Sequence, residues 1–340
     1  MMRLPWFEYR APAGVGEAAR ILAGEGPNAM LIAGGTDLLP NMKRRHQAPA
    51  ALVSLRRIEE LRKVSNGSGL SLGSGLTLSA VVHSAAVREK YAGLYEAAAQ
   101  VATTHLRNMG TLGGNLCLDT RCNYYNQNYE WRKAIDFCMK KDGDICWVAT
   151  ASKRCVAVSS TDTAPALIAL GAKVRLVSAS GEREVTVANL YHNDGMEYLT
   201  RRPDEILTSV LLPESAGWKS SYWKLRRRGA FDFPVLGVAA AVKTAPDGTV
   251  EEARIALGAV ASRPFLVEKA GALLVGKRLT DESIAEAGAL VASRAKPMDN
   301  ADLDIYWRKG VVSAFVGYAL QEIRGDDMRA TRLRIARHAL

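Results

Sequence analysis

The cysteines of this chain are confined to one region. All five lie between residues 117 and 155, as Cys117, Cys122, Cys138, Cys146 and Cys155. Their spacing, C-x4-C-x15-C-x7-C-x8-C, contains neither the C-x2-C knuckles typical of tetrathiolate zinc sites nor the C-x2-C-x2-C run of bacterial ferredoxins. From spacing alone, a zinc site, an iron–sulfur cluster and a set of unligated thiols all remain open.

Two glycine-rich loops have residues suited to holding a dinucleotide. They are LIAGGTDL at residues 31–38 and RNMGTLGGN at residues 107–115. Glycine lets the backbone approach a ligand closely, and the N–H groups of such loops bind phosphate. Each loop alone is equally well explained as a tight turn, but together they can converge on one ligand. Neither is a Rossmann fingerprint or a P-loop, so a nicotinamide cofactor has no evident site.

Hydrophobic periodicity indicates the elements that must position these loops. A helix at residues 16–23 with strands at 29–33 and 51–55 forms a small α/β unit. An alternating strand is expected from Leu70, and a helix at 89–102. The last third carries strand-like runs at 206–212, 221–226, 235–242 and 253–260, and helices at 281–294 and 311–323. The meander-like strands predict an α+β fold.

Composition and charge exclude little. The net charge of +10 comes from basic residues spread along the chain, outside any nucleic-acid module, which leaves a solvated surface or an acidic protein partner. No apolar run reaches the ~18 residues of a membrane span. The first residues include proline, glutamate and arginine where a secretory signal needs an apolar core. We therefore expect a cytoplasmic protein that binds neither nucleic acid nor membrane.

Four motifs in a fixed order carry a family resemblance. AGGTDL at 33–38, RNMGTLGGNLC at 107–117, DTAPAL at 162–167 and Lys-x-Arg at 224–226 resemble the FAD-binding medium subunits of the molybdenum hydroxylases. The resemblance covers roughly residues 1–290. It implies a vanillyl-alcohol-oxidase-type two-part FAD-binding fold, followed by a C-terminal α+β domain with an antiparallel sheet. The expected divisions are residues 1–60, 61–178, 179–290 and a helical extension at 291–340.

The resemblance also implies which residues bind FAD. Both glycine loops would bind the diphosphate, Asp162 would meet the ribityl or adenosine side, and Leu207 would pack against the rings. Lys224 would lie near the isoalloxazine, where a cation stabilises the negative charge of reduced flavin. The full expected set is Leu31, Ile32, Ala33, Gly34, Gly35, Thr36, Asp37, Leu38, Val101, Thr111, Leu112, Gly113, Gly114, Asn115, Asp162, Leu207 and Lys224.

An insertion at residues 119–159 separates the second loop from the helix expected at the DTAPAL motif. In typical relatives that helix follows the loop within a few residues. The insertion carries four of the cysteines, whereas Cys117 belongs to the loop itself. This insertion and the run GGNLCxDTRCxxYNQ at 113–127 resemble the β subunits of 4-hydroxybenzoyl-CoA reductases. The resemblance implies an inserted lobe in which Cys122, Cys138, Cys146 and Cys155 hold a [4Fe–4S] cluster.

The function implied is electron transfer, with no catalytic residue in this chain. Electrons from a ferredoxin would pass through the cluster and FAD toward a small [2Fe–2S] subunit and a large molybdenum-cofactor subunit, for reductive dehydroxylation to benzoyl-CoA. The expected assembly is a heterohexamer, a dimer of heterotrimers. Two alternatives remain: the medium subunit of another molybdenum hydroxylase with a different aromatic substrate, and a zinc-stapled, non-catalytic assembly module.

Overall fold

The computed structural model describes residues 3–337, which form three sheets. The first is parallel, in the order β1-β3-β2. Its strands are β1 (Glu8–Arg10), β2 (Ala29–Ile32) and β3 (Ala51–Ser54). Helix α1 (Val15–Glu25) packs Ala18 and Leu22 against Val53 of β3. The expected α/β unit is confirmed, and α2 (Leu38–Lys43) follows the first glycine loop.

The second sheet has the order β4-β5-β8-β6-β7. Its strands are β4 (Val64–Asn66), β5 (Gly69–Gly73), β6 (Lys173–Ser178), β7 (Gly181–Thr186) and β8 (Ile206–Pro213). The division expected near residue 178 thus falls in the β6–β7 hairpin, and the sheet continues to Pro213. Strand β5 is antiparallel to both neighbours, β4 and β8. Segments that are distant in sequence therefore build one layer.

The strand expected from Leu70 is present as β5 but is shorter than the alternating pattern, and the helix expected at 89–102 was wrong. The alternation that begins at Leu70 stops being a strand at Gly73, because Leu78 already starts α3, capped by the Thr77 hydroxyl. The single helix expected at 89–102 is two helices that meet at the buried Tyr91, whose hydroxyl donates to the Pro213 carbonyl at 2.8 Å. The helices beside this sheet are α3 (Leu78–His83), α4 (Ala85–Lys90), α5 (Ala92–Ala99), α6 (Thr104–Arg107), α7 (Leu112–Leu116) and α9 (Thr163–Ala169).

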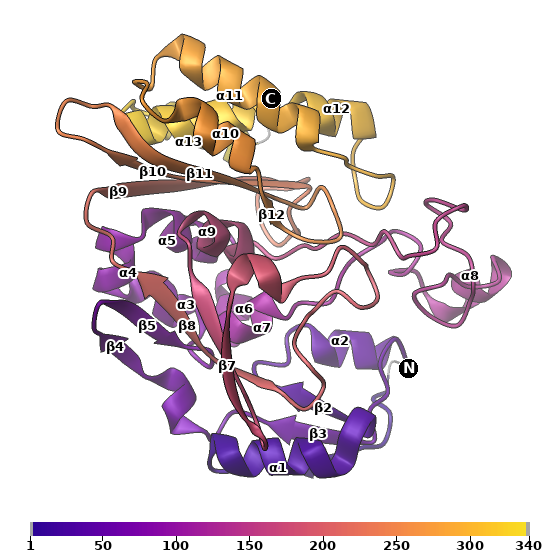
Figure 1. Ribbon diagram of the computed structural model, residues 1–340. Helices are drawn as coiled ribbons and strands as arrows, with labels where there is room; N and C mark the ends of the chain where they lie inside the picture. The colour runs from indigo at the N-terminus through magenta and orange to yellow at the C-terminus, as the bar shows by residue number, and fades with distance from the viewer. Residues whose placement is uncertain (1–2, 338–340) are drawn as a thin grey trace.

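The third sheet is antiparallel, in the order β12-β11-β10-β9. Its strands are β9 (Trp218–Leu225), β10 (Leu236–Thr244), β11 (Val250–Gly258) and β12 (Phe265–Leu266). Successive side chains of a strand point to opposite faces: Val238 and Val242 of β10 join the core under the C-terminal helices, whereas Ala239 and Ala241 join the core shared with α5 and α9. Figure 1 shows this sheet between the two sets of helices.

The antiparallel sheet confirms the C-terminal domain that was expected, and helices follow it in the sequence. They are α10 (Glu268–Leu274), α11 (Asp281–Arg294), α12 (Ile305–Gly310), α13 (Val312–Arg324) and α14 (Arg329–Ala336). The short 3₁₀ helices are η1 (Gly26–Asn28), η2 (Glu59–Arg62) and η3 (Val187–Leu190). None of the helices within residues 3–337 is both long and apolar enough to cross a membrane.

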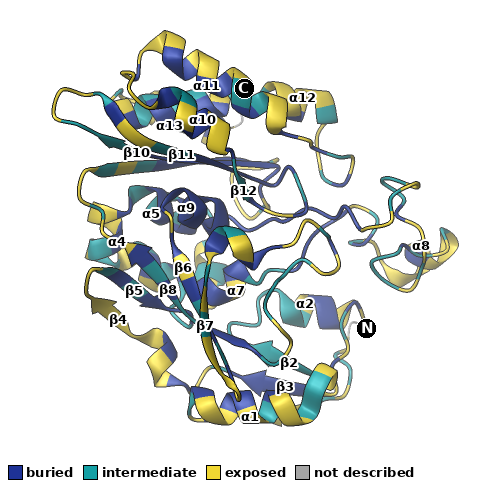
Figure 2. Ribbon diagram, viewed as in Figure 1, coloured by how far each residue is buried: buried dark blue, intermediate teal, exposed yellow. Residues whose placement is uncertain are grey.

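The cysteine-rich excursion forms a lobe that projects from the body of the molecule (Figure 1). We call residues 119–159 the cysteine lobe. It contains one short helix, α8 (Tyr129–Ala134), and its surface is largely exposed around that helix (Figure 2). At its base, Arg121 and Val158 exchange two backbone hydrogen bonds of 2.8 and 2.7 Å. The chain therefore enters and leaves the lobe at the same place.

Candidate functional site

The two glycine loops meet in space, as their residue types predicted. A Cβ atom placed on Gly34 would overlap the carbonyl of Met109, so only glycine allows this approach. Thr111 then begins α7, and its hydroxyl accepts a hydrogen bond from the Gly114 amide at 3.1 Å. These contacts bring together the end of β2 and the start of α7.

A cavity of about 830 Å³ lies along both loops. Most of the residues expected to bind FAD line it: residues 31–38, Val101, Thr111, Gly113, Gly114, Asn115, Asp162 and Leu207. Leu112 is fully buried in the core. It and Lys224 are not among the described residues that line the cavity. The volume is within the range of cofactor sites.

Asn115 joins the second loop to the start of α9. Its side-chain oxygen accepts hydrogen bonds from the hydroxyls of Thr161 and Thr163, at 2.8 and 2.7 Å. All three residues are buried. This arrangement holds the loop against the Asp162 segment, so Asn115 shapes the cavity through hydrogen bonds within the protein.

Lys224 reaches the cavity only through Asp162. Its ammonium lies 2.9 Å from the Asp162 carboxylate and 3.1 Å from the Gln100 carbonyl, and the Tyr222 hydroxyl donates to the same carboxylate at 2.7 Å. Burial raises the pKa of Asp162, and the Lys224 charge opposes that rise. The two residues, expected at different parts of the flavin, are thus one ion pair.

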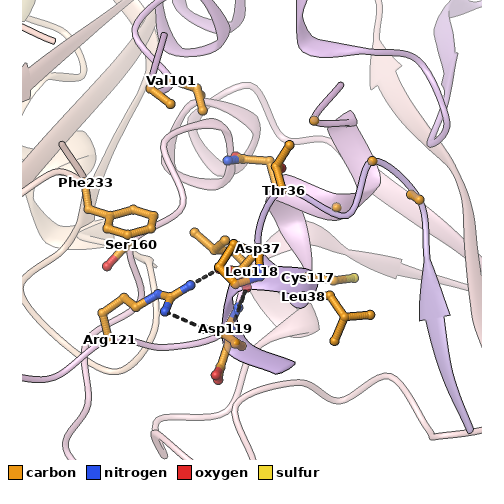
Figure 3. Close-up of a pocket in the computed structure, with 18 of the residues that line it drawn as sticks. Thr36, Asp37, Leu38, Val101, Cys117, Leu118, Asp119, Arg121, Ser160 and Phe233 are labelled. Carbon is orange, nitrogen blue, oxygen red and sulfur yellow. Dashed lines mark hydrogen bonds and ion pairs between the residues drawn. The ribbon is translucent and has the colours of Figure 1, made fainter. Parts of the chain in front are cut away.

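Several residues of the cavity were missed from the sequence. Arg121 forms an ion pair with Asp37 and donates to the Asn41 side chain at 3.0 Å, and its guanidinium lies 5.0 Å from the centre of the Phe233 ring. Figure 3 shows Arg121 between Phe233 and the loop that carries Asp37. Further arginines line the same cavity: Arg44, Arg201, Arg227 and Arg228. Three of these five arginines pair with carboxylates of the cavity wall: Arg121 with Asp37, Arg227 with Asp302 and Arg228 with Asp232. Guanidinium groups are suited to binding a diphosphate.

The four cysteines of the lobe line a second, much smaller cavity. Cys122, Cys138, Cys146 and Cys155 are each buried, and none is in a disulfide. The cavity is covered by Tyr124, Tyr125, Met139, Trp147 and Val148. Cys117 lies apart from them, among the residues that line the large cavity.

Two of these thiols, Cys122 and Cys155, have backbone N–H groups beside their sulfur atoms. Burial raises the pKa of Cys122 to about 11, and the backbone N–H groups of Tyr124 and Tyr125 oppose that rise. The Ala157 amide likewise donates to Cys155 Sγ at 3.4 Å. Thiols with high pKa values stay protonated until a metal displaces the proton. Within residues 3–337, no group of three or more His, Cys, Asp or Glu side chains is gathered closely enough for one metal ion.

Comparison with known proteins covers nearly the whole chain. Residues 5–215 match the family described as FAD binding domain in molybdopterin dehydrogenase, and residues 220–323 match the CO dehydrogenase flavoprotein C-terminal domain. The chain is 33% identical over 258 residues to the aldehyde oxidoreductase FAD-binding subunit PaoB of Escherichia coli (strain K12), which covers 73% of this chain and 80% of that protein.

Carbon monoxide dehydrogenase is similar along almost its full medium chain. The medium chain from Hydrogenophaga pseudoflava is 28% identical over 321 residues, covering 93% of this chain and 96% of that one. A solved structure of carbon monoxide dehydrogenase from the same organism, lacking the Mo-pyranopterin moiety, superposes with a TM-score of 0.76 at 28% identity. That superposition covers 94% of this chain and 97% of the other.

Proposed function

Because the chain belongs to the FAD-binding medium subunits of the molybdenum hydroxylase family, we propose that it is the electron-transfer subunit of a 4-hydroxybenzoyl-CoA reductase. One observation carries this proposal beyond the family. Four buried thiols surround a single cavity in a lobe that adjoins the large cavity. Four thiols around one cavity are the donor set that a single [4Fe–4S] cluster takes.

FAD would occupy the large cavity. The first glycine loop would bind its diphosphate through backbone N–H groups. The second would line the same site, since its amides at Leu112, Gly113 and Gly114 already donate within the protein. Arg121, paired with Asp37, would add a guanidinium group. Leu207 and Val101 would supply apolar contacts for the rings. Of the Lys224–Asp162 pair, Asp162 would face the bound FAD and Lys224 would lie behind it. When bound, FAD can accept or release one or two electrons.

A [4Fe–4S] cluster would be held by Cys122, Cys138, Cys146 and Cys155. When bound, it would supply one-electron transfer at low potential. A single zinc ion needs four sulfurs about 2.3 Å from the metal, and the thiols are not gathered that closely. A four-iron cluster is larger and takes its thiolates from farther apart. The spacing of the four thiols around one cavity therefore favours the cluster over the zinc-stapled module.

The partners follow from this role. A ferredoxin would deliver electrons at the cysteine lobe, whose projection from the body leaves its surface accessible. The electrons would leave toward a small [2Fe–2S] subunit and a large molybdenum-cofactor subunit, where 4-hydroxybenzoyl-CoA would lose its hydroxyl group. We expect these three chains to assemble as a dimer of heterotrimers in the cytoplasm.

Cofactor analysis of the full chain tests the cofactor assignment. Anaerobically purified protein is expected to contain about one FAD and about four iron with four acid-labile sulfides. Cys146→Ser should lose the iron and sulfide and keep the FAD. Cys117→Ser is the matched control, because Cys117 lies outside the cysteine cavity, and it should keep its iron. Zinc in place of iron in the wild-type chain would refute the cluster.

A second experiment tests the substrate. The assembled complex, supplied with reduced viologen, is expected to convert 4-hydroxybenzoyl-CoA to benzoyl-CoA. A panel of aryl-CoA thioesters and heteroaromatic compounds serves as the comparison. Turnover of another compound without turnover of the 4-hydroxy thioester would reject the reductase and leave another molybdenum hydroxylase as the parent enzyme.

A further inference from the structure

A single layer of side chains separates the cysteine cavity from the large cavity. Tyr125 and Lys140 line the cysteine cavity, and Asp119 and Tyr198 line the large one. Both residues of the cysteine cavity contact Asp119. Lys140 Nζ lies 2.9 Å from Asp119 Oδ1, and the Tyr125 hydroxyl donates to Asp119 Oδ2 at 3.0 Å. One carboxylate therefore joins the walls of the two cavities.

Lys140 is a buried cation in that layer. Its side chain is 7% exposed, and that of Asp119 is 5% exposed. All three donors of the ammonium are used, because it also donates to the Thr120 hydroxyl at 2.8 Å and to the Gly195 carbonyl at 2.6 Å. The rings of Tyr125 and Tyr198 have their centres 4.8 and 5.5 Å from Nζ. The position of the charge is thus fixed from several sides.

Lys140 also lies beside the thiols, because it lines the same small cavity as Cys122, Cys138, Cys146 and Cys155. A fixed cation favours any added negative charge nearby, more strongly where water is excluded. Asp119 offsets part of that effect, since it places one negative charge beside the ammonium.

We propose that the positive charge of Lys140 raises the reduction potential of the iron–sulfur centre. Asp119 positions Lys140 and, through its own negative charge, reduces the size of that effect. This inference rests on the proposed function. One electron from a reduced ferredoxin, or from dithionite in vitro, adds one negative charge at the thiolate-ligated centre, and the donor is oxidised by one electron. The ammonium would stabilise the reduced form because its buried positive charge lies at the wall of the cavity that would hold the centre.

The test is a redox titration of the full chain, followed by electron paramagnetic resonance of the reduced centre. Lys140→Gln is expected to lower the equilibrium constant for one-electron reduction about tenfold, which is ~59 mV. Lys140→Arg keeps the charge and should retain most of the wild-type potential. Lys141→Gln is the matched control: it removes the same charge one residue away, where Lys141 is 34% exposed and pairs with Asp142. Its potential should stay at the wild-type value.

A second variant covers the case in which Lys140→Gln fails to fold. Asp119→Asn removes the negative charge but keeps an oxygen that can accept from Lys140, so the ammonium stays in place and the potential should rise. An unchanged potential in Asp119→Asn, or in a Lys140→Gln protein that retains iron and sulfide, would overturn the inference. That result differs from failure of the proposed function, in which the wild-type chain itself would lack iron and sulfide.

Discussion

The ammonium of Lys224 and the carboxylate of Asp162 form a buried ion pair of 2.9 Å, with side chains 0% and 3% exposed. Lys224 belongs to β9, in the C-terminal domain, and Asp162 directly precedes α9, in the FAD-binding domain. The pair thus ties the two domains together at the wall of the large cavity. Removing one partner should lower the stability of the protein, because the other charge would be left buried and unpaired.

Breaking this pair is expected to destabilise the protein strongly. Lys224→Met should lower the free energy of unfolding by about 3–5 kcal/mol, since it leaves the Asp162 carboxylate buried and unpaired. The double variant Lys224→Met with Asp162→Asn should recover part of that loss. Urea denaturation followed by fluorescence measures both. Simple addition of the two single losses would show that the residues are not coupled.

A surface pair provides the control for that measurement. Lys277 and Glu286 lie 2.9 Å apart with side chains 47% and 57% exposed. Lys277→Met should change the free energy of unfolding by about 0–1 kcal/mol, because water screens an exposed pair. A similar loss in both variants would point to a general effect of removing lysine.

The contact between the two glycine loops should be required for FAD retention. In Gly34→Ala the new methyl group would overlap the Met109 carbonyl, and forcing the loops apart costs about 1–3 kcal/mol. We expect affinity for FAD to fall about tenfold or more, measured by the 450 nm absorbance retained after gel filtration. Gly24→Ala is the control, because no atom lies within 4 Å of its added Cβ. Equal FAD loss in both would contradict the proposed cofactor position.

The stability of the protein should depend on pH through Glu96. Burial raises the pKa of Glu96 to about 7, although Arg332 opposes the rise; Arg332 lies 2.9 Å from Glu96 and 2.5 Å from Glu322, so two carboxylates share one guanidinium. Because the folded-state pKa is above the unfolded value of 4.5, the folded chain binds more protons between these values. This contribution to stability is present below pH 4.5 and is lost as pH rises toward 7.

Glu96→Gln should remove that dependence. Relative to wild type, the variant is expected to gain stability between pH 5 and 8, by up to about 3 kcal/mol, in denaturant unfolding at each pH. Glu286→Gln, at an exposed position, should run parallel to wild type over the same range. A parallel curve for Glu96→Gln as well would mean that Glu96 is already ionised at pH 5.

The regular elements could be predicted where one periodicity dominates. Residues 281–294 predict a helix, and α11 has those bounds, since the capping box of Thr280 and Ser283 marks its start. The predictions failed where a contact with a distant part of the chain determines where an element ends. Tyr91 interrupts a helix-like sequence because its hydroxyl bonds to Pro213, far along the chain. No local pattern carries that information.

Only part of the candidate site could be predicted from the sequence. Gly34 predicted a loop with a close backbone approach, and it contacts the Met109 carbonyl. Gly113 and Gly114 were also expected in a loop, but they lie in the short helix α7, at the wall of the same cavity. The association of Asp162 with Lys224, and of Arg121 with Phe233, depends on how the third sheet packs against the FAD-binding domain. Such pairings follow from tertiary structure, which the spacing of single residues does not encode.

The backbones of Arg121 and Val158 form an isolated bridge where the chain enters and leaves the cysteine lobe. Because this bridge lies outside the three sheets, a change in the length of the lobe would leave the register of their strands unchanged. A flavoprotein with a short turn at this point could gain such a lobe in one genetic event. Selection would then act on the few side chains of the separating layer, where the new segment contacts the older cavity.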